Sequence, residues 1–562
     1  MIRSNLQRPT ALTLQRGDVI FRGTTRVLFV PGSVEESGTG LFYDGGFSWG
    51  ITDTTQLTLA FQHVDSGSGI LNNIADFNIA RTDDNEAVLE LKQNFWRNEN
   101  VSVSGLIGLS FLPTGFGFNF NPTDGGSQIQ DTEEDFTVVP ALSIPVTISN
   151  ERGQATFGPT VAFFQQDSTG VLPTVPGEGG SYGTTFGLSS SLSYNVAPRL
   201  TLFGDAFFPL TGNNALSRSE AEPAKAIVYN AGLRYLVNPR VALDVFATNA
   251  LGSFGPTSLQ GDRDFTSLAT TISFLPEVFS ENRRYRDSFD AAPATDRYTI
   301  DGLGFFDGGT VPSGRSLFQI QGGTQGVMTS FRYGFTRDLE AGVYLDYITS
   351  DIDESEQGVS GKIRLLNQAQ GSPLTASLAA TVGLPNEPFV NFFNNDRDSF
   401  DDNDLDRSVP FLFQGDNLAK GQLFIVTVSL PLTYQFDDSN AALWLTPTIG
   451  YVQRSGTELA GFNVGGSLPI VDSLSILGEV GANFTEPGNA LLSDNRGNVI
   501  PWTIALRWDP SGFFGTDVEV DSSTRPYIEL YVTNRVGSSA WHQLRVRDKA
   551  DPAFGLGLLL PF

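Results

Sequence analysis

Cysteine is absent from this 562-residue chain, and histidine is rare, with two copies. A chain without cysteine can have no disulfide framework, no thiolate nucleophile and no cysteine-ligated metal. His63 ends an apolar strand face, and His542 follows Ala540-Trp541 in a polar loop, where we expect it to be solvated. No Ser/His/Asp set follows from their spacing. We therefore expect no enzyme, no cofactor and no metal centre.

Long apolar runs and basic patches are missing as well. No run of about 18 apolar residues occurs, which excludes a transmembrane helix. Lysine and arginine total 35 against 62 acidic residues, a net charge of −27, which excludes nucleic acid as a partner. The first residues, 1–5, lack the charged and apolar regions of a signal peptide. We expect a mature form, or a fragment with an added Met.

The chain does contain a long series of alternating segments. In 185–196 the apolar side chains fall on one face, and Ser, Thr, Gly and Asn fall on the other; 101–111 and 426–436 repeat this pattern. Such segments are longer than the five or six residues of a usual globular strand. Their length matches a tilted strand that crosses a bilayer. The pattern predicts an all-β fold, an antiparallel transmembrane β-barrel.

Connections of two lengths join these segments. Short turns occur at 52–54, 197–199, 238–240, 336–338 and 471–473, and long polar loops at 66–85, 113–134, 167–181, 386–420 and 537–553. In outer-membrane barrels the short turns are periplasmic and the long loops extracellular. The acidic run 396–406 has some spacing of a calcium loop but lacks its glycine and final glutamate. We interpret this run as a solvated loop, with weak calcium binding as the alternative.

The final strand alternates up to an aromatic end, with apolar residues at Phe554, Leu556, Leu558, Leu560 and Phe562. This pattern resembles the carboxy-terminal β-signal by which outer-membrane barrels are recognised for assembly. The resemblance implies the bacterial outer membrane as the location. It also implies the barrel assembly machinery, membrane lipid and lipopolysaccharide as partners.

The two halves of the chain resemble each other. Residues 202–205 match 476–479, and 104–113 match 376–385. We count about twelve strands in each half, so that each half starts and ends on the periplasmic side. The expected organisation is an N-terminal segment at 1–16, a first barrel repeat at 17–276, a periplasmic linker at 277–316 and a second repeat at 317–562. This tandem duplication fits two barrels of about twelve strands or one barrel of about 24 strands. A terminal strand phrase in each half and the linker of some forty residues favour two barrels.

The duplicated layout, together with Arg8-Pro9-Thr10-Ala11-Leu12-Thr13-Leu14 before Gly17 and the first strand, resembles the YjbH-like exopolysaccharide-associated barrels. In that family a Pro-Thr-Ala phrase also precedes a first strand. The motif is short, and only the layout extends over the whole chain. The resemblance implies a role in the export of a polysaccharide.

Charged residues on the polar strand faces must face water or one another, because a charge facing lipid costs several kcal/mol. Hairpin geometry places Arg234 opposite Asp244, and Arg507 and Glu529 hold the matching places. Asp205 and Glu479 point inward by phase and are interpreted as unpaired carboxylates. These lumen charges either select solutes or fasten a filled interior.

Two functions follow from these patterns. The first is a conduit, for passive diffusion of small solutes or for export of a polymer such as exopolysaccharide. The second is a structural or adhesive outer-membrane protein with filled barrels and functional surface loops. The sequence contains no obvious plug domain, which favours the smaller barrels because a wide lumen needs a plug.

Overall fold

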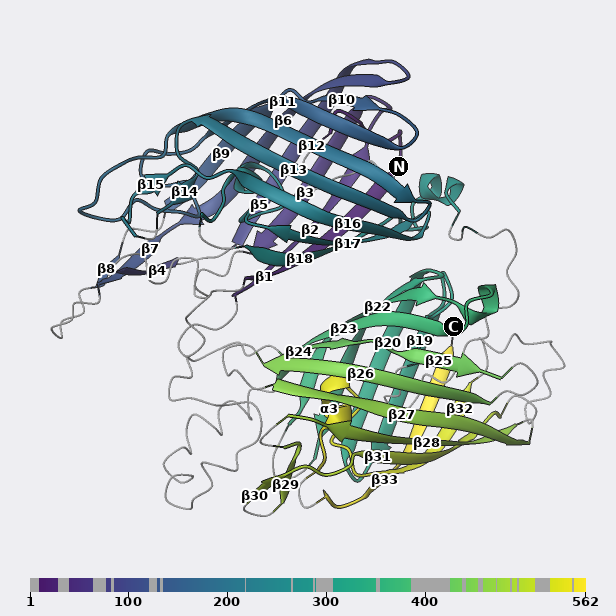
Figure 1. Cartoon of the computed structure of the whole chain (residues 1–562). Coiled ribbons are helices and arrows are strands. Elements are labelled where there is room, and N and C mark those ends of the chain that lie inside the picture. Colours follow the sequence, from purple (N-terminus) through teal and green to yellow (C-terminus); the bar gives the residue numbers. More distant parts are fainter. Residues whose placement is uncertain are drawn as a thin grey trace. The chain divides into compact units, whose positions relative to one another are not determined.

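The computed structural model contains two closed antiparallel barrels of twelve strands each (Figure 1). It describes the chain except for residues 1–9, 29–39, 64–76, 82–84, 121–128, 132–134, 218, 264–265, 287–288, 290–306, 350–353, 386–424, 437–440, 453–457, 472, 486–487, 493–494, 511–525, 548–549 and 562. Internal contacts divide the chain into Met1–Asp287 and Ser288–Phe562, with one barrel in each unit.

The first barrel is built in sequence order from β1 (Val19–Leu28), β2 (Gly40–Gly50), β3 (Thr55–His63), β5 (Asn85–Arg97), β6 (Val101–Thr114), β9 (Asp135–Ser143) with β10 (Val146–Ser149), β11 (Gly153–Phe163), β12 (Thr184–Ala197), β13 (Leu200–Thr211), β16 (Val228–Asn238), β17 (Val241–Thr248) and β18 (Ser267–Phe274). Neighbouring strands pair in antiparallel fashion. β1 pairs with β18 from Phe21↔Phe274 to Leu28↔Ser267, which closes the ring.

The second barrel repeats this order with β19 (Ser316–Gly323), β20 (Gly326–Thr336), β21 (Leu339–Ile348), β22 (Glu356–Leu366), β23 (Thr375–Pro385), β24 (Ile425–Ser429) with β25 (Leu432–Gln435), β26 (Ala442–Val452), β27 (Glu458–Val471), β28 (Leu474–Asn483), β31 (Trp502–Trp508), β32 (Tyr527–Thr533) and β33 (Ala553–Pro561). Pairing of β19 with β33 closes it. The prediction of two barrels is therefore confirmed, and the alternative of one larger barrel is wrong because each half closes on itself.

One strand of each barrel is interrupted by a proline in the same place. Pro145 separates β9 from β10, and both pieces pair with β6 and β11. Pro431 separates β24 from β25 in the same way, so the strand predicted at 426–436 is two strands. Proline cannot donate to a strand ladder, which explains the breaks. Its carbonyl still accepts, from Ser104 N at 3.1 Å and from Ser377 N at 3.0 Å.

The apolar side chains of the strands point out of the barrels and the polar ones point in. In β12 Leu192 is 62% exposed, whereas Thr185 and Ser193 are buried; in β24 Val428 is exposed and Thr427 is buried. Such an apolar outer surface suits lipid, and a closed barrel leaves no strand edge unpaired there. The chain is a transmembrane β-barrel protein of the bacterial outer membrane. Among the described residues, no helix is long and apolar enough to span a membrane.

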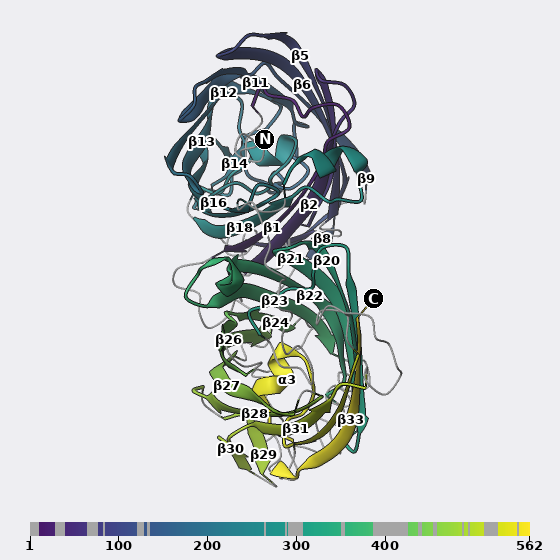
Figure 2. The same ribbon diagram turned by 90° about the vertical axis from the view of Figure 1, so that its right-hand side faces the viewer.

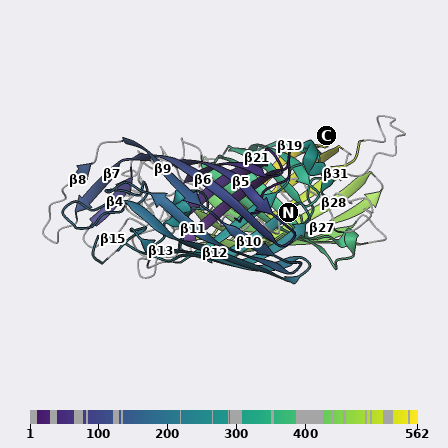
Figure 3. The same cartoon turned by 90° about the horizontal axis from the view of Figure 1, so that it is seen from above.

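Several short elements complete the fold. β4 (Phe77–Arg81), β7 (Phe116–Phe120) and β8 (Ile129–Asp131) form a small sheet beyond one end of the first barrel, as Figures 1 and 3 show. The others are the hairpins β14 (Ala215–Leu216)–β15 (Pro223–Ala224) and β29 (Ala490–Leu492)–β30 (Asn495–Gly497), the 3-10 helices η3 (Pro256–Leu259), η4 (Ser280–Arg284) and η5 (Gln368–Gln370), and the helix α3 (Ala540–Leu544).

The stretch predicted as a linker contains structure at both of its ends. At its start, η4 docks on β1: the Asn282 side chain accepts from Val19 N at 3.1 Å and donates to Val19 O at 2.7 Å. At its end, residues from 307 onward contact the strands of the second barrel. The periplasmic assignment of this stretch remains a prediction.

Candidate functional site in the barrel lumens

Arg234 and Asp244 form a buried ion pair inside the first barrel. They lie directly opposite each other on β16 and β17. Arg234 Nε and Nη2 each donate to one Asp244 carboxylate oxygen, both at 2.6 Å, and neither side chain is exposed. A bidentate pair of this kind fixes the two strands in register, because both oxygens are used and the guanidinium is planar.

Arg507 and Glu529 hold the matching places on β31 and β32 of the second barrel. Arg507 Nε and Nη2 both donate to the same oxygen, Glu529 Oε1, at 2.5 Å. The guanidinium also lies over the ring of Tyr527, 5.1 Å from its centroid. The pair is therefore present at the matching position of both barrels.

Asp205 and Glu479 are not the unpaired carboxylates that the sequence suggested. Asp205 Oδ1 accepts from Asn230 Nδ2 at 2.6 Å. Glu479 lies 2.5 Å from Arg535 Nη1 and accepts from the Trp444 indole. For Glu479 the interpretation was wrong, because Arg535 comes from a loop that folds into the lumen, which strand phase alone cannot reveal. Asn230, which donates to Asp205, is a neutral amide.

Two short stretches, called here the entry segments, thread into the barrels ahead of the first strands. They are residues 10–18 in the first barrel and 307–315 in the second. Ala11 N donates to Thr147 Oγ1 at 2.8 Å, and Gly308 N donates to Thr433 Oγ1 at 2.8 Å. Ser104 Oγ donates to the Ala11 carbonyl at 2.6 Å. The same backbone position is thus held between the same wall strands in both barrels.

Each entry segment turns into its first strand at a glycine with positive φ. Gly17 has φ 81° and Gly314 has φ 74°. Gly17 N donates to the Gly50 carbonyl at 2.7 Å, and Gly314 N donates to the Gly334 carbonyl at 2.8 Å. The left-handed backbone favours glycine here.

Two longer stretches, called here the lumen loops, fold in from the connection before the last strand. They are residues 249–262 in the first barrel and 534–547 in the second, and Figure 2 shows α3 of the second loop inside its ring of strands. A single bridge pairs the ends of each, Ala250↔Gly261 and Arg535↔Val546. The long loop predicted at 537–553 is therefore largely a lumen element.

The two lumen loops are anchored by the same asparagines. Asn249 Oδ1 accepts from Tyr229 N at 2.8 Å, and Asn534 Oδ1 accepts from Trp502 N at 2.7 Å. A second asparagine in each barrel donates to a carbonyl of the loop. Asn214 donates to Leu259 O at 2.8 Å in the first barrel, and Asn489 donates to Leu544 O at 2.6 Å in the second. These matches establish 249–262 and 534–547 as equivalent parts of the two barrels.

In the second barrel the lumen loop is fastened to wall carboxylates. Asp346 on β21 accepts from Ser538 N at 2.6 Å, from Ser539 N at 2.8 Å and from His542 Nδ1 at 2.9 Å. His542 Nε2 lies 3.7 Å from Glu356 Oε2 on β22. Both ring nitrogens of His542 therefore face carboxylates, an arrangement that favours the imidazolium.

His542 is only 1% exposed, so the prediction that it is solvated is wrong. Burial by itself lowers the pKa of this imidazole. The hydrogen bond to Asp346 and the charges of Glu356, Asp346 and Glu354 outweigh burial and raise the pKa above its ordinary value. The histidine is thus held in its charged form where a free histidine would lose its proton.

In the first barrel the equivalent loop contacts the wall through neutral groups of its own, and Arg26 on β1 donates to Ser253 Oγ. Gln62 Oε1 on β3 accepts from Ser253 N at 2.7 Å. This hydrogen bond is the counterpart of the one from Ser538 N to Asp346 in the second barrel. Thr257 Oγ1 donates to Glu86, as His542 faces Glu356. Gly255 N donates to Glu90 at 2.8 Å. The wall still supplies carboxylates here, but the loop supplies no cation.

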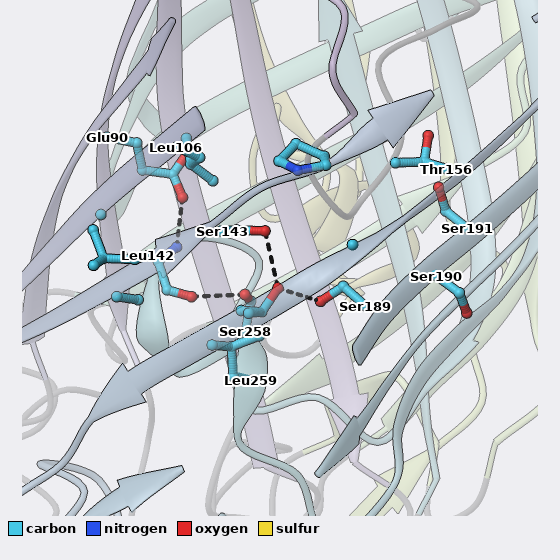
Figure 4. Close-up of a pocket in the computed structure, with 16 residues that line it drawn as sticks. Glu90, Leu106, Leu142, Ser143, Thr156, Ser189, Ser190, Ser191, Ser258 and Leu259 are labelled. Atoms are coloured by element: carbon cyan, nitrogen blue, oxygen red, sulfur yellow. Dashed lines mark hydrogen bonds between the residues drawn. The ribbon is translucent and has the colours of Figure 1, made fainter. Parts of the chain in front are cut away.

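A cavity of about 40 Å³ lies in the first barrel between β9, β11, β12 and the lumen loop (Figure 4). The Thr160 hydroxyl lies 2.9 Å from both the Ser143 and Ser189 hydroxyls, which forms a polar row across three strands. The Ser191 hydroxyl has no hydrogen-bond partner within the described residues. This cavity has space for about three waters, so protein does not fill the lumen at this level.

The other predicted features have mixed outcomes. Phe554 and Leu556 point outward and are exposed on β33, and Leu558 and Leu560 are partly exposed. Phe562 and the acidic run 396–406 lie outside the described residues. His63 packs on Tyr43 at the end of β3, with ring centroids 4.7 Å apart. The loop predicted as polar at 167–181 instead buries apolar residues at Val171, Leu172 and Val175.

Sequence reasoning missed both lumen loops, although a signal was present. Thr248-Asn249-Ala250-Leu251-Gly252 and Thr533-Asn534-Arg535-Val536-Gly537 share a Thr-Asn-x-x-Gly pattern. Asn214-Ala215-Leu216 and Asn489-Ala490-Leu491 share a second one. Repeated asparagines in loops, rather than strands, carried this information.

No family model and no curated protein matches the sequence. Among solved structures, the chain is similar to the NanC porin, with 9% identity and a TM-score of 0.26 over 46% of this chain and 98% of that chain. It is similar to outer membrane phospholipase A from Escherichia coli, with 11% identity and a TM-score of 0.25 over 46% and 92%. It is also similar to the ferric enterobactin receptor PfeA from Pseudomonas aeruginosa, with 9% identity and a TM-score of 0.20 over 98% and 81%.

Proposed function

We propose that the protein is an outer-membrane conduit in which each barrel is closed by its own lumen loop. The observation that carries this proposal is the way the lumens are occupied. Polar wall residues hold two separate chain segments by hydrogen bonds, and a hydroxyl-lined cavity remains beside one of them. Twelve strands give a lumen between the filled interior of small barrels and the aqueous channel of porins.

The lumen loops are suited to movement by the geometry of their ends. The bridges Ala250↔Gly261 and Arg535↔Val546 place the two ends of each loop side by side at the wall. A segment closed in this way can swing out without breaking the strand ladder. The narrow lumen that it would vacate suits a small solute or a single extended polymer chain.

A polysaccharide is the finer proposal for what passes. The walls carry rows of hydroxyl groups, such as Ser143 with Thr160 and Ser429 with Thr448, each 2.9 Å apart. These groups exchange hydrogen bonds readily with a polyhydroxylated chain. The resemblance of the start of the chain to the YjbH-like barrels supports the same substrate class, and Ala11 of that motif is the residue held in the lumen.

We also infer that the two barrels are copies of one duplicated unit. The supporting observations are the shared proline breaks, entry segments and lumen-loop anchors. Equivalent residues in the two halves then differ because each barrel has specialised. Residues at equivalent positions can therefore serve as matched controls for one another.

A liposome-swelling assay tests the conduit. Variants that lack residues 250–261 or 535–546, each joined by two glycines, should admit neutral sugars faster than the intact protein. Deletion of the loop should increase the entry rate of trisaccharides more than that of monosaccharides, because the loop narrows the path. Folded variants that admit no sugar would contradict the conduit and leave the structural or adhesive function.

One observation favours that alternative. The first barrel has an apolar cluster that includes Phe116, Phe118, Val171, Leu172 and Tyr182. Apolar packing of this kind opens less readily than hydrogen bonds to a wet wall. A rigid, closed first barrel would then display the β4–β7–β8 sheet as a binding surface.

A further inference from the structure

The second lumen loop differs from the first in carrying cations. Residues 534–547 include Arg535, His542, Arg545 and Arg547, whereas 249–262 include one charged residue, Asp262. The cations do not face solvent: Arg535, His542 and Arg545 are each no more than 2% exposed. Three buried positive groups on one loop must therefore be matched by the wall.

The wall supplies that match from separate elements. Asp346 and Glu356 face His542 from β21 and β22, and Glu479 faces Arg535 from β28. Arg545 pairs with Glu354, two residues before the start of β22, and the Tyr344 hydroxyl on β21 donates to Glu356. β24, β26 and β27 also pack on α3, and their described side chains contribute no ionised group. A polar contact from β27 is that of Asn463 Nδ2, 3.5 Å from Gln543 Oε1.

His542 is the member of this set whose charge changes near neutral pH. An arginine stays charged at any pH a protein survives. When His542 loses its proton, two wall carboxylates lose their cation and one ring nitrogen becomes an acceptor facing a carboxylate. Two buried acids without a counterion repel each other and are poorly solvated.

We propose that the loop 534–547 is a latch that releases the second barrel when His542 loses its proton, and that the first barrel has no such release. This inference rests on the proposed conduit function and names its regulation. The structural contrast that carries it lies in two equivalent positions. Asp346 and His542 of the second barrel are charged partners, whereas Gln62 and Thr257, which hold their places in the first barrel, are neutral.

The direction with pH follows from the raised His542 pKa. A group whose pKa is higher in the latched state stabilises that state fully below its ordinary value, and this stabilisation is lost as pH rises through the raised value. Alkaline conditions therefore open the second barrel. Acid protonates wall carboxylates in both barrels, so an acid effect would not distinguish them.

Single cysteines report loop release because the natural chain has none. Leu544→Cys and Leu259→Cys stand at equivalent buried positions, so the ratio of their maleimide labelling rates cancels the titration of the thiol itself. As pH rises from the ordinary pKa of histidine through the raised value in the latched state, the ratio should rise by up to about tenfold per pH unit. In a His542→Gln background, which keeps a neutral donor, the ratio should stay flat.

Planar-bilayer conductance of the same proteins tests the conduit function separately from the latch. A rising ratio without conductance would keep the latch and overturn the conduit. Conductance with a flat ratio, or with an equal rise in the His542→Gln background, would overturn the latch and keep the conduit. If His542→Gln does not fold, as judged by heat-modifiable gel mobility, His542→Thr supplies the residue found in the first barrel and takes its place.

Discussion

The loops 249–262 and 534–547 follow the same path through equivalent barrels, but their contacts differ in chemistry. In the first barrel the loop offers backbone N–H groups and the Thr257 hydroxyl to Gln62, Glu86 and Glu90. In the second barrel it offers an imidazole and arginines to carboxylates. The contacts of the first loop contain no group that loses a positive charge as pH rises, whereas the buried ion pairs of the second loop are costly to break until one partner loses its charge.

The largest expected difference concerns the wall pairs rather than the loops. Arg234→Ala should lower the free energy of unfolding by about 3–5 kcal/mol, because it removes the bidentate ion pair from the fully buried Asp244 carboxylate. Arg507→Ala should cost less, about 2 kcal/mol, because the Arg507 side chain is 8% exposed and water can replace it beside Glu529. Urea unfolding in lipid vesicles measures both.

Arg152→Ala is the matched control for these arginines. Arg152 is exposed in the turn before β11, so its removal should change stability by less than about 0.5 kcal/mol. Equal costs for Arg234→Ala and Arg507→Ala would mean that the difference in burial does not distinguish the two pairs.

A smaller difference is expected at the entry segments. Gly17→Ala meets two penalties, a positive φ and a Cβ placed 2.3 Å from Glu281 Cγ of the docked η4. Gly314→Ala meets only the first, because nothing lies within 4 Å of its Cβ. The backbone penalty alone is about 1–2 kcal/mol, so Gly17→Ala should cost more than Gly314→Ala in the same unfolding assay.

A double variant sharpens that result. If contact with η4 causes the excess cost, then in a Glu281→Ala background the stability lost by Gly17→Ala should fall close to that lost by Gly314→Ala, since the clashing Glu281 Cγ is gone. An excess that survives Glu281→Ala would assign the cost to another part of the first barrel.

The sequence predicted the barrels well because strand alternation reports directly on which side faces lipid. Leu192 and Val428 point outward as their phase requires, and Thr185 and Thr427 point inward. The similarity of the halves did not decide between two barrels and one larger barrel. Strand alternation depends on residues close together in the chain, so a local pattern is sufficient to show it.

The lumen contents could not be predicted in the same way. His542 looked like a loop residue because the carboxylates that bury it, Asp346 and Glu356, lie almost two hundred residues earlier in the chain, as the separation of 196 between His542 and Asp346 shows. Glu479 looked unpaired for the same reason, since Arg535 reaches it only after the loop folds inward. Contacts between a loop and a distant wall leave no periodicity.

Single-channel recording of the two loop deletions as pH is raised tests the central claim most directly. The protein that lacks 250–261 should conduct at every pH and gain a second conductance step under alkaline conditions, because its second barrel still has the His542 latch. The protein that lacks 535–546 should conduct at every pH without that step. Silence from both folded proteins, or an alkaline step that persists without 535–546, would contradict the account.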